Sequence, residues 1–287
     1  MASVKKVESD GWIKSIREAS ADRESTDRFT GTGGHQGLTK LPFSQQAFKK
    51  VAEKFLIHRS IIRVIRRADV PEFSATKLKM GDLNGWAPPA YVYDARTSNA
   101  WHGDLALSAT YFPHSKLTFA VLFGCSLSIE AEILTRLGKT AHEIGHPLIM
   151  PGIVFELELS RHQSVVEEEL KEVEARALGV SDFMIMLRDG TLRTQEVKKK
   201  TKRDKFLDLK YLTGQLNDWK NALRAMHDHA DTITPSDTHW DASKQEMKHT
   251  GTKIQGRLQE VMSDYEIMMR ACAAATEGMN IPIPLID

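Results

Sequence analysis

Two long apolar stripes constrain the fold of this 287-residue chain more than any other feature. In residues 209–230 and again in residues 254–275, apolar side chains recur at intervals of three and four positions. This spacing places them on one face of an α-helix, and a face that is apolar over about three heptads packs against another surface. Residues 155–177 carry a further stripe of this kind. We therefore expect long helices packed side by side in a bundle or stalk, with polar linkers near residues 180–204 and 231–249.

The middle of the chain predicts β-strands. Residues 90–93, 105–112 and 117–123 are rich in apolar, β-branched and aromatic side chains, and residues 113–116 have the length of a hairpin connection. The last of these strands, LTFAVLF, is apolar on both alternating faces, so we expect it to be central in its sheet and covered by helices on both sides. Upstream, apolar positions in residues 44–67 recur at helical spacing and predict one helix or two.

Together these patterns predict an α/β fold with long helices, in which a mixed sheet is covered by helices and followed by a helical bundle or stalk. We expect the sheet portion in residues 43–145 and the long-helix portion, packed on it, in residues 146–280. Residues 1–42 include the glycine-rich run GTGGHQG and are expected to form a flexible segment, with a tail at residues 281–287. These glycines follow neither the phosphate-loop spacing nor the dinucleotide-binding spacing.

Charge and cysteine content argue against several classes of function. Lys plus Arg (39) nearly balance Asp plus Glu (38), so no overall field favours nucleic acid or an anionic membrane. Cys125 and Cys272 are too few for a disulfide framework. The longest apolar run, residues 117–129, is interrupted by polar residues and is shorter than the roughly 20 residues of a membrane-spanning helix. We expect a soluble, cytoplasmic protein with no membrane span and no nucleic-acid partner.

One short motif points to zinc chemistry. HEIGH, at residues 142–146, matches the H-E-x-x-H pattern in which one helix presents two histidine ligands and a glutamate that acts as general base. Pro147 follows the second histidine, where its ring would clash with the carbonyl of Glu143 in a continuous helix. We therefore expect a helix junction here, with Pro147 early in the next helix. A zinc-dependent metallohydrolase is the alternative hypothesis, with His142 and His146 as ligands and Glu143 as the base.

The sequence does not select a third zinc ligand. The extended metzincin pattern needs glycine at position 149 and histidine at position 152, where this chain has Ile149 and Gly152. Glu156, Glu158 and Glu167 are available as carboxylate ligands, but their spacing favours none of them. We therefore assign no catalytic and no cofactor-binding residue, and the metal ligands stay open.

Other polar residues have ordinary structural interpretations. His162 lies on the apolar stripe and is expected to be a core histidine with a hydrogen-bond partner. His227 and His229 lie two positions apart, so on a helix they point in different directions. A solvated helix face is expected for the densest acidic run, which consists of Glu167, Glu168, Glu169, Glu172 and Glu174.

Four segments carry a family resemblance. They are IHRSIIRVIRRADVPEFSATKLKMG (57–81), AYVYDARTSNAWHGDLALSATYFPHSKLTFAVLFGCS (90–126), HPLIMPGIVFELELSRH (146–162) and RLQEVMSDYEIMMRACAAATEGM (257–279). In these segments the chain resembles the soluble part of fungal CorA-like magnesium-transporter proteins. The resemblance implies an αβα cytoplasmic domain followed by long helices that lead, in true transporters, to two membrane spans. It also implies that the HPL-x-x-P-G-I run opens a long helix.

The chain departs from that family at its end. Residues 278–280 spell the GMN signature that closes the first membrane helix of CorA channels. The preceding segment carries Asp264, Glu266, Arg270 and Glu277, and charges are expensive at membrane depth. Only IPIPLID follows, which is too short for a second span. We interpret this GMN as coincidental and expect either a naturally soluble relative or a fragment that ends before the membrane.

The leading functional hypothesis is a non-enzymatic binding or regulatory module that needs no cofactor, responds to Mg²⁺ and has no transport activity of its own. Mg²⁺ prefers oxygen ligands and keeps several waters, so one or two carboxylates suffice for a site. A homo-oligomer through the heptad helices and a separate protein partner are both hypotheses. A helical protein-interaction scaffold is a further alternative, which an exposed apolar strip along residues 209–230 or 254–275 would favour.

Overall fold

The computed structural model describes most of the chain. The described residues are 38, 44–66, 71–79, 89–140, 143, 145–177, 195–233 and 242–280, without the side chains of 176–177, 195–204, 242–244 and 279–280. The expected flexible segment at residues 1–42, apart from Leu38, and the tail at residues 281–287 lie outside them. The elements are α2 (Gln45–Lys54), α3 (Ser60–Arg66), β1 (Glu72–Lys79), β2 (Pro89–Arg96), β3 (Ala106–Phe112), β4 (Leu117–Phe123), α4 (Leu127–Lys139), α5 (Ile149–Ala177), α7 (Gln195–Ile233) and α8 (Ala242–Asn280).

The four strands form an antiparallel meander in the order β1-β2-β3-β4. In the register of the central pair, Tyr91 of β2 lies opposite Tyr111 of β3. The expectation of a mixed sheet is therefore wrong for the described strands. The reason lies in the connections: residues 97–105 and 113–116 are too short for the crossover of a dozen or more residues that a parallel pair needs.

The position of β4 corrects a second expectation. LTFAVLF is an edge strand, and the central position next to it belongs to β3, whose side chains are more deeply buried. The predicted cover on both faces is nevertheless present. Phe123 packs with Ile61 of α3 on one face, while Leu122 packs on the other face against the long helices and Ile133 of α4. Because helices close over both faces of this edge strand, its sequence resembles that of a central one.

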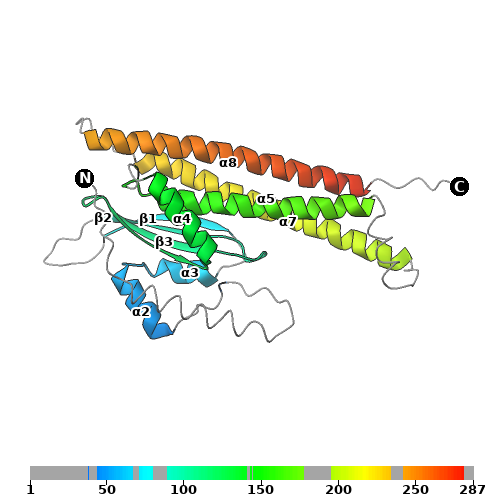
Figure 1. Ribbon diagram of the computed structural model, residues 1–287, viewed down its shortest axis with the longest axis horizontal. Coiled ribbons are helices and arrows are strands. Elements are labelled where there is room, and N and C mark those ends of the chain that lie inside the picture. Colours follow the sequence, from blue (N-terminus) through cyan, green and yellow to red (C-terminus); the bar gives the residue numbers. More distant parts are fainter. Residues whose placement is uncertain are drawn as a thin grey trace.

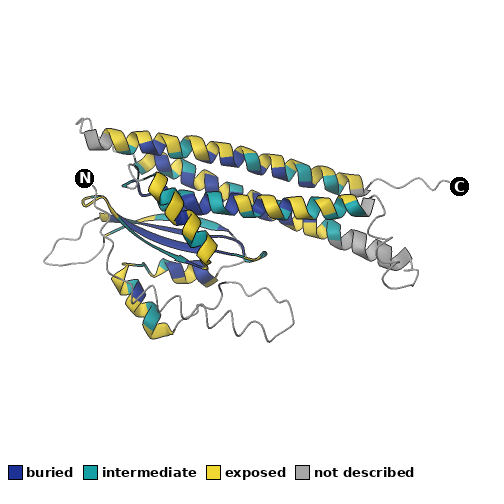
Figure 2. Ribbon diagram, in the orientation of Figure 1, coloured by how far each residue is buried: buried dark blue, intermediate teal, exposed yellow. Residues whose placement is uncertain are grey.

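Helices lie on both sides of the sheet, as expected, and the larger core lies on the side of the long helices (Figures 1 and 2). Tyr93, Leu107 and Tyr111 point to that side and share one apolar cluster with residues of α5, α7 and α8. Alternate strand residues such as Ala106 point to α3 and form a smaller cluster. The sheet portion and the long-helix portion therefore share a continuous core.

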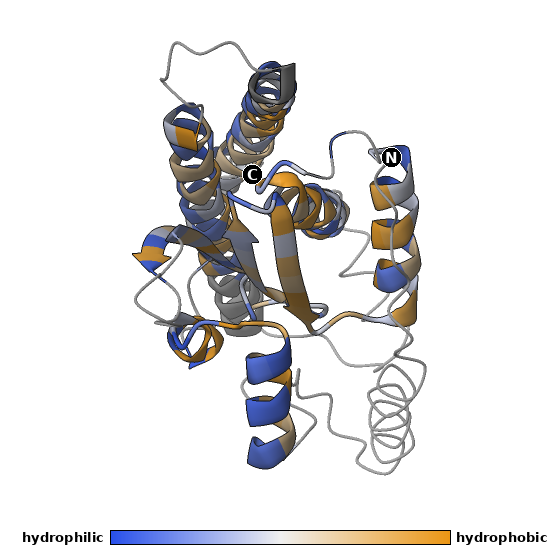
Figure 3. Ribbon diagram, turned by 90° about the vertical axis from the view of Figure 1, so that its left-hand side faces the viewer, coloured by the Kyte–Doolittle hydropathy of each residue, from blue (hydrophilic) through white to orange (hydrophobic). Residues whose placement is uncertain are grey.

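Within the range 44–67 the described residues form two helices, α2 and α3, which decides between the two arrangements that the sequence predicts. Ser44 caps α2 by accepting a hydrogen bond from the backbone N–H of Ala47 at 3.2 Å. Leu56 follows α2 with φ of 52°, a left-handed conformation that ends a helix. Most of α2 is hydrophilic (Figure 3), and it buries Val51.

The three long helices confirm the predicted stripes. The apolar positions of α7 and α8 from Leu209 to Cys272 are largely buried, including Trp219 and Tyr265, and they pack against each other and α5 within one chain. The helices are longer than predicted, because α7 starts at Gln195 and α8 at Ala242 inside the expected polar linkers. Those added turns are rich in lysine, glutamine and glutamate, which favour helix without an apolar stripe. None of the described helices is long and apolar enough to span a membrane.

Candidate functional site

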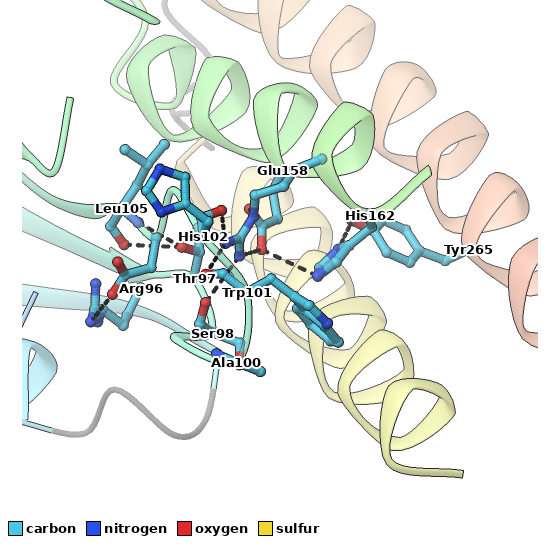
Figure 4. Close-up of polar contacts among 12 residues, drawn as sticks. Arg96, Thr97, Ser98, Ala100, Trp101, His102, Leu105, Glu158, His162 and Tyr265 are labelled. Atoms are coloured by element: carbon cyan, nitrogen blue, oxygen red, sulfur yellow. Dashed lines mark hydrogen bonds and ion pairs between the residues drawn. The ribbon is translucent and has the colours of Figure 1, made fainter. Parts of the chain in front are cut away.

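The most distinctive polar site lies where the loop of residues 97–105, between β2 and β3, meets α5 (Figure 4). Arg161 of α5 reaches this loop. Its guanidinium donates hydrogen bonds to the carbonyl oxygens of Trp101 at 3.1 Å, His102 at 3.2 Å and Ser98 at 3.0 Å. One side chain therefore fixes the loop of the sheet to a long helix.

The same guanidinium pairs with Glu158, one helical turn earlier. Nε of Arg161 donates to one carboxylate oxygen of Glu158 at 2.7 Å, and a terminal nitrogen donates to the other. Glu158 is almost completely buried, and burial raises its pKa while the charge of Arg161 opposes that shift. A two-pronged contact of this kind satisfies a carboxylate that water does not reach.

His162 extends the network to α8. Its Nδ1 lies 2.8 Å from the hydroxyl oxygen of Tyr265, and its Nε2 lies 3.3 Å from a carboxylate oxygen of Glu158. The ring also meets Trp101 edge to face, with centroids 5.4 Å apart. Burial, with a smaller effect from Arg161, lowers the pKa of His162 to about 3, so the imidazole is neutral near pH 7. This confirms the predicted core histidine.

The other end of the loop is held by a second buried pair. Asp104 accepts hydrogen bonds from Nη2 of Arg96 at 2.6 Å and from the backbone N–H of Leu38 at 3.0 Å. Thr97 and Leu105 close the base of the loop, because the hydroxyl oxygen of Thr97 accepts the N–H of Leu105 at 2.7 Å. Both ends of the loop therefore have fixed positions.

The HEIGH motif does not occupy a helix in the part of the chain that the structure describes. Glu143 and His146 lie in turns between α4 and α5, and α5 begins at Ile149, while His142 lies outside the described residues. The predicted helix junction is confirmed, although Pro147 precedes the first helical residue by two positions. The arrangement that H-E-x-x-H zinc sites need, with both histidines on one helical face, is not seen there.

His146 and Glu143 have other partners. His146 is buried, and its Nδ1 accepts the backbone N–H of Leu148 at 3.2 Å, next to the start of α5. Burial lowers the pKa of His146 to about 4, and Glu143 opposes that shift. The carboxylate of Glu143 pairs with Lys253 of α8 at 2.6 Å. A small pocket of about 60 Å³ beside these residues is also lined by Thr250.

The candidate carboxylate ligands are dispersed. Glu158 belongs to the loop network, and Glu167 lies 3.6 Å from Lys171 on the exposed side of α5. Glu156 pairs with Arg136 and Arg257. Among the described residues, no group of three or more His, Cys, Asp or Glu side chains is placed to hold a metal ion. The structure therefore assigns no metal ligand.

The remaining polar residues divide between solvent and helix contacts: Glu167, Glu168 and Glu174 are exposed as expected, whereas His229, Glu169 and Glu172 are partly buried. His227 lies beside Asp228, and His229 packs its ring on Tyr93 with centroids 5.5 Å apart, so the two histidines point in different directions as expected. In the acidic run, Glu169 and Glu172 both pair with Lys205 of α7.

No protein-family model matches the chain, and no curated protein matches it. The resemblance to CorA-like proteins therefore stays a prediction.

Proposed function

We propose that the chain is a non-enzymatic binding and regulatory module of the CorA-like cytoplasmic type, in which the sheet portion and the long helices respond to a ligand as one unit. The contact of Arg161 with the loop of residues 97–105 carries this proposal. It joins the sheet to α5, and Glu158, His162 and Tyr265 continue the connection to α8.

The energetics of this contact support coupled movement. A shift of the loop would break three hydrogen bonds to Arg161 and disturb the pair that it forms with Glu158. Hydrogen bonds to charged groups contribute about 1.5–3 kcal/mol each, and a buried donor or acceptor left without a partner adds a further penalty. Moving the loop without the helix would therefore be costly, so the two are expected to move together, which is what coupling between distant parts requires.

The proposed input is Mg²⁺, which follows from the family resemblance and has no assigned ligands here. The order of elements, a sheet with helices on both sides followed by long helices, agrees with what that resemblance implies. Glu143 and Glu246 both line the small pocket beside α8, where Glu143 also pairs with Lys253. A hydrated Mg²⁺ ion needs only one or two of them.

The test is a titration of the full chain with millimolar MgCl₂ at constant ionic strength, with CaCl₂ as the control ion. Trp101 and Trp219, two of the five tryptophans, lie against His162, so a change in the network is expected to shift part of the tryptophan emission. We expect Mg²⁺ to raise the melting temperature and shift the emission. No change in melting temperature, emission or oligomeric mass would remove Mg²⁺ from the proposal.

Coupling is tested separately by hydrogen exchange of Arg161→Met against Arg224→Met, a change on the exposed side of α7. We expect Arg161→Met to speed exchange in the loop of residues 97–105 and also in α5 and α8, and Arg224→Met to leave all three unchanged. Faster exchange in the loop alone would refute the coupling and leave the loop as a local feature.

A further inference from the structure

The turn that joins α2 to α3 presents two large apolar side chains to solvent. Phe55 and Leu56 follow the last residue of α2, and each is 38% exposed. Leu56 has φ of 52°, in the left-handed region, where a bulky side chain is an outlier and glycine or asparagine is usual. The position is therefore unfavourable for leucine in two respects, its backbone conformation and its contact with water. An outlier of this kind at the surface points to a contact that the free chain does not make.

The backbone of this turn is held in place from the sheet. The carbonyl oxygen of Leu56 accepts a hydrogen bond at 2.8 Å from the hydroxyl of Thr110, a buried residue of β3. The N–H of Phe55 donates to the carbonyl oxygen of Val51 in α2 at 2.9 Å. The backbone is therefore fixed while the two apolar side chains remain exposed, which lowers the entropy cost of a contact through them.

Cations surround the turn. Residues 45–66 contain one carboxylate, Glu53, and six exposed cations, which are Lys49, Lys50, Lys54, Arg59, Arg63 and Arg66. Among the described residues, only Arg63 of these six has an ion-pair partner, Glu72. The whole chain has a net charge of +1, so the rest of it carries a net negative charge. The balanced composition therefore hides a local basic surface.

On α3 the basic and apolar residues share one face. Arg59 immediately precedes the helix, and Ile62, Arg63 and Arg66 follow it at helical spacing. Ile62 is 46% exposed between these arginines, whereas the opposite side of the helix is buried against the sheet. Figure 1 shows α2 and α3 on the side of the sheet away from α7 and α8, so the long helices do not cover this face. The turn and α3 therefore present apolar side chains within a region of positive charge.

This combination matches the surface of an anionic phospholipid membrane. Lysine and arginine side chains contact the negatively charged headgroups, while apolar side chains among them enter the boundary between headgroups and acyl chains. Nucleic acid offers the same negative charge but no apolar layer for the aliphatic side chains of Leu56 and Ile62. We propose that the chain binds reversibly to anionic lipid surfaces through a membrane-contact surface formed by Phe55, Leu56, Arg59, Ile62 and Arg66. This inference needs no membrane-spanning helix and does not depend on the proposed function.

The experiment is co-sedimentation of the full chain with lipid vesicles. One set of vesicles contains phosphatidylcholine alone, and the other contains about one third phosphatidylserine. We expect binding to the anionic vesicles only, and weaker binding as salt is added. Each Lys or Arg near such a surface raises the affinity about fivefold, so Arg66→Gln should weaken binding by about that factor. Arg224→Gln, which changes an exposed arginine of α7, is the matched control and should bind like the wild type.

Leu56→Asn separates binding from folding. Asparagine tolerates the left-handed conformation better than leucine does, and it keeps the carbonyl that accepts from Thr110. The melting temperature of this variant should therefore equal or exceed that of the wild type, while its affinity for anionic vesicles falls at least about fivefold. Leu127→Asn is the control, because Leu127 on α4 is the most exposed large apolar residue in the described part of the chain, and it should keep wild-type binding.

Three results would overturn the proposal. Equal sedimentation of the chain with and without either kind of vesicle would mean that it makes no lipid contact. Equal binding to both kinds of vesicle would mean that the cations play no part. Vesicle binding that Arg66→Gln weakens and Leu56→Asn does not would reflect charge alone, the behaviour expected of a surface for nucleic acid or an acidic protein.

Discussion

The buried position of His146 predicts a pH-dependent stability that one substitution isolates. His146 is 4% exposed, and burial lowers its pKa from 6.5 to about 4. The unfolded chain therefore takes up a proton at this residue near pH 6.5, whereas the folded chain does so only near pH 4. The stability supplied by the neutral imidazole is complete above pH 6.5 and is lost as the pH falls toward 4.

The magnitude follows from linkage. One pKa unit corresponds to about 1.4 kcal/mol. Between about pH 7.5 and about pH 5, the histidine becomes almost fully protonated in the unfolded chain and hardly at all in the folded one, so the wild type loses about 2 kcal/mol through His146. In His146→Asn an amide oxygen can still accept the N–H of Leu148, and it does not titrate. We expect the pH-dependent loss to be smaller by about 2 kcal/mol in this variant.

The assay is urea unfolding followed by circular dichroism at both pH values, with a chelator present so that no metal contributes. His114→Asn, the same substitution in the exposed turn before β4, is the control for the change of side chain itself. Glu158 acts in the opposite direction, because its raised pKa makes its contribution to stability grow as the pH falls. This effect is the same in the wild type and in His146→Asn, so it cancels when the two losses of stability are compared. Equal losses in the wild type and His146→Asn would refute the reasoning.

Arg161→Met leaves a buried carboxylate without its partner and should lower the free energy of unfolding by about 3–5 kcal/mol in urea; a loss below about 1 kcal/mol would contradict the buried network. Gly124→Ala should lower the free energy of unfolding by more than about 1 kcal/mol, because φ of Gly124 is 84° and the added methyl would meet the carbonyl of Asp104. Gly138→Ala, in contrast, has open space in a helix and should leave the free energy of unfolding unchanged or raise it slightly. Mass spectrometry of protein purified without chelators or a histidine tag should find far less than one zinc per chain in the wild type and in His142→Ala; near-stoichiometric zinc in the wild type alone would revive the metallohydrolase.

The long helices were predictable because their information is local. In residues 209–230 each apolar position follows the last by one helical turn, and the structure buries these same positions. The strand β1, with sequence EFSATKLK, was missed because Phe73 and Ala75 alternate with polar residues but Leu78 breaks the alternation, so no regular pattern predicts a strand. The helix α4 was missed because its apolar residues face two ways and so make no single stripe.

The candidate site was only partly predictable. His162 was recognised as a core histidine from its place on an apolar stripe, and Glu158 was considered only as a zinc ligand. Arg96 and Tyr265 reach the network from other elements, and sequence spacing does not encode such contacts. The available signal was the interruption of the buried side of α5 by the charged residues Glu158 and Arg161, because charges on a buried face need partners.

The meander of the sheet has a consequence for how the chain folds. Each strand pairs with its neighbour in sequence, and α7 and α8 pack against each other across a short connection, so most contacts join residues that are close along the chain. Contacts between the halves span much longer distances, since Tyr93 meets His229 and Tyr111 meets Met247 across 136 positions. Low contact order favours rapid folding, and closing long loops is slow. The sheet and the helical hairpin are therefore expected to form early, and their docking to be the slow step.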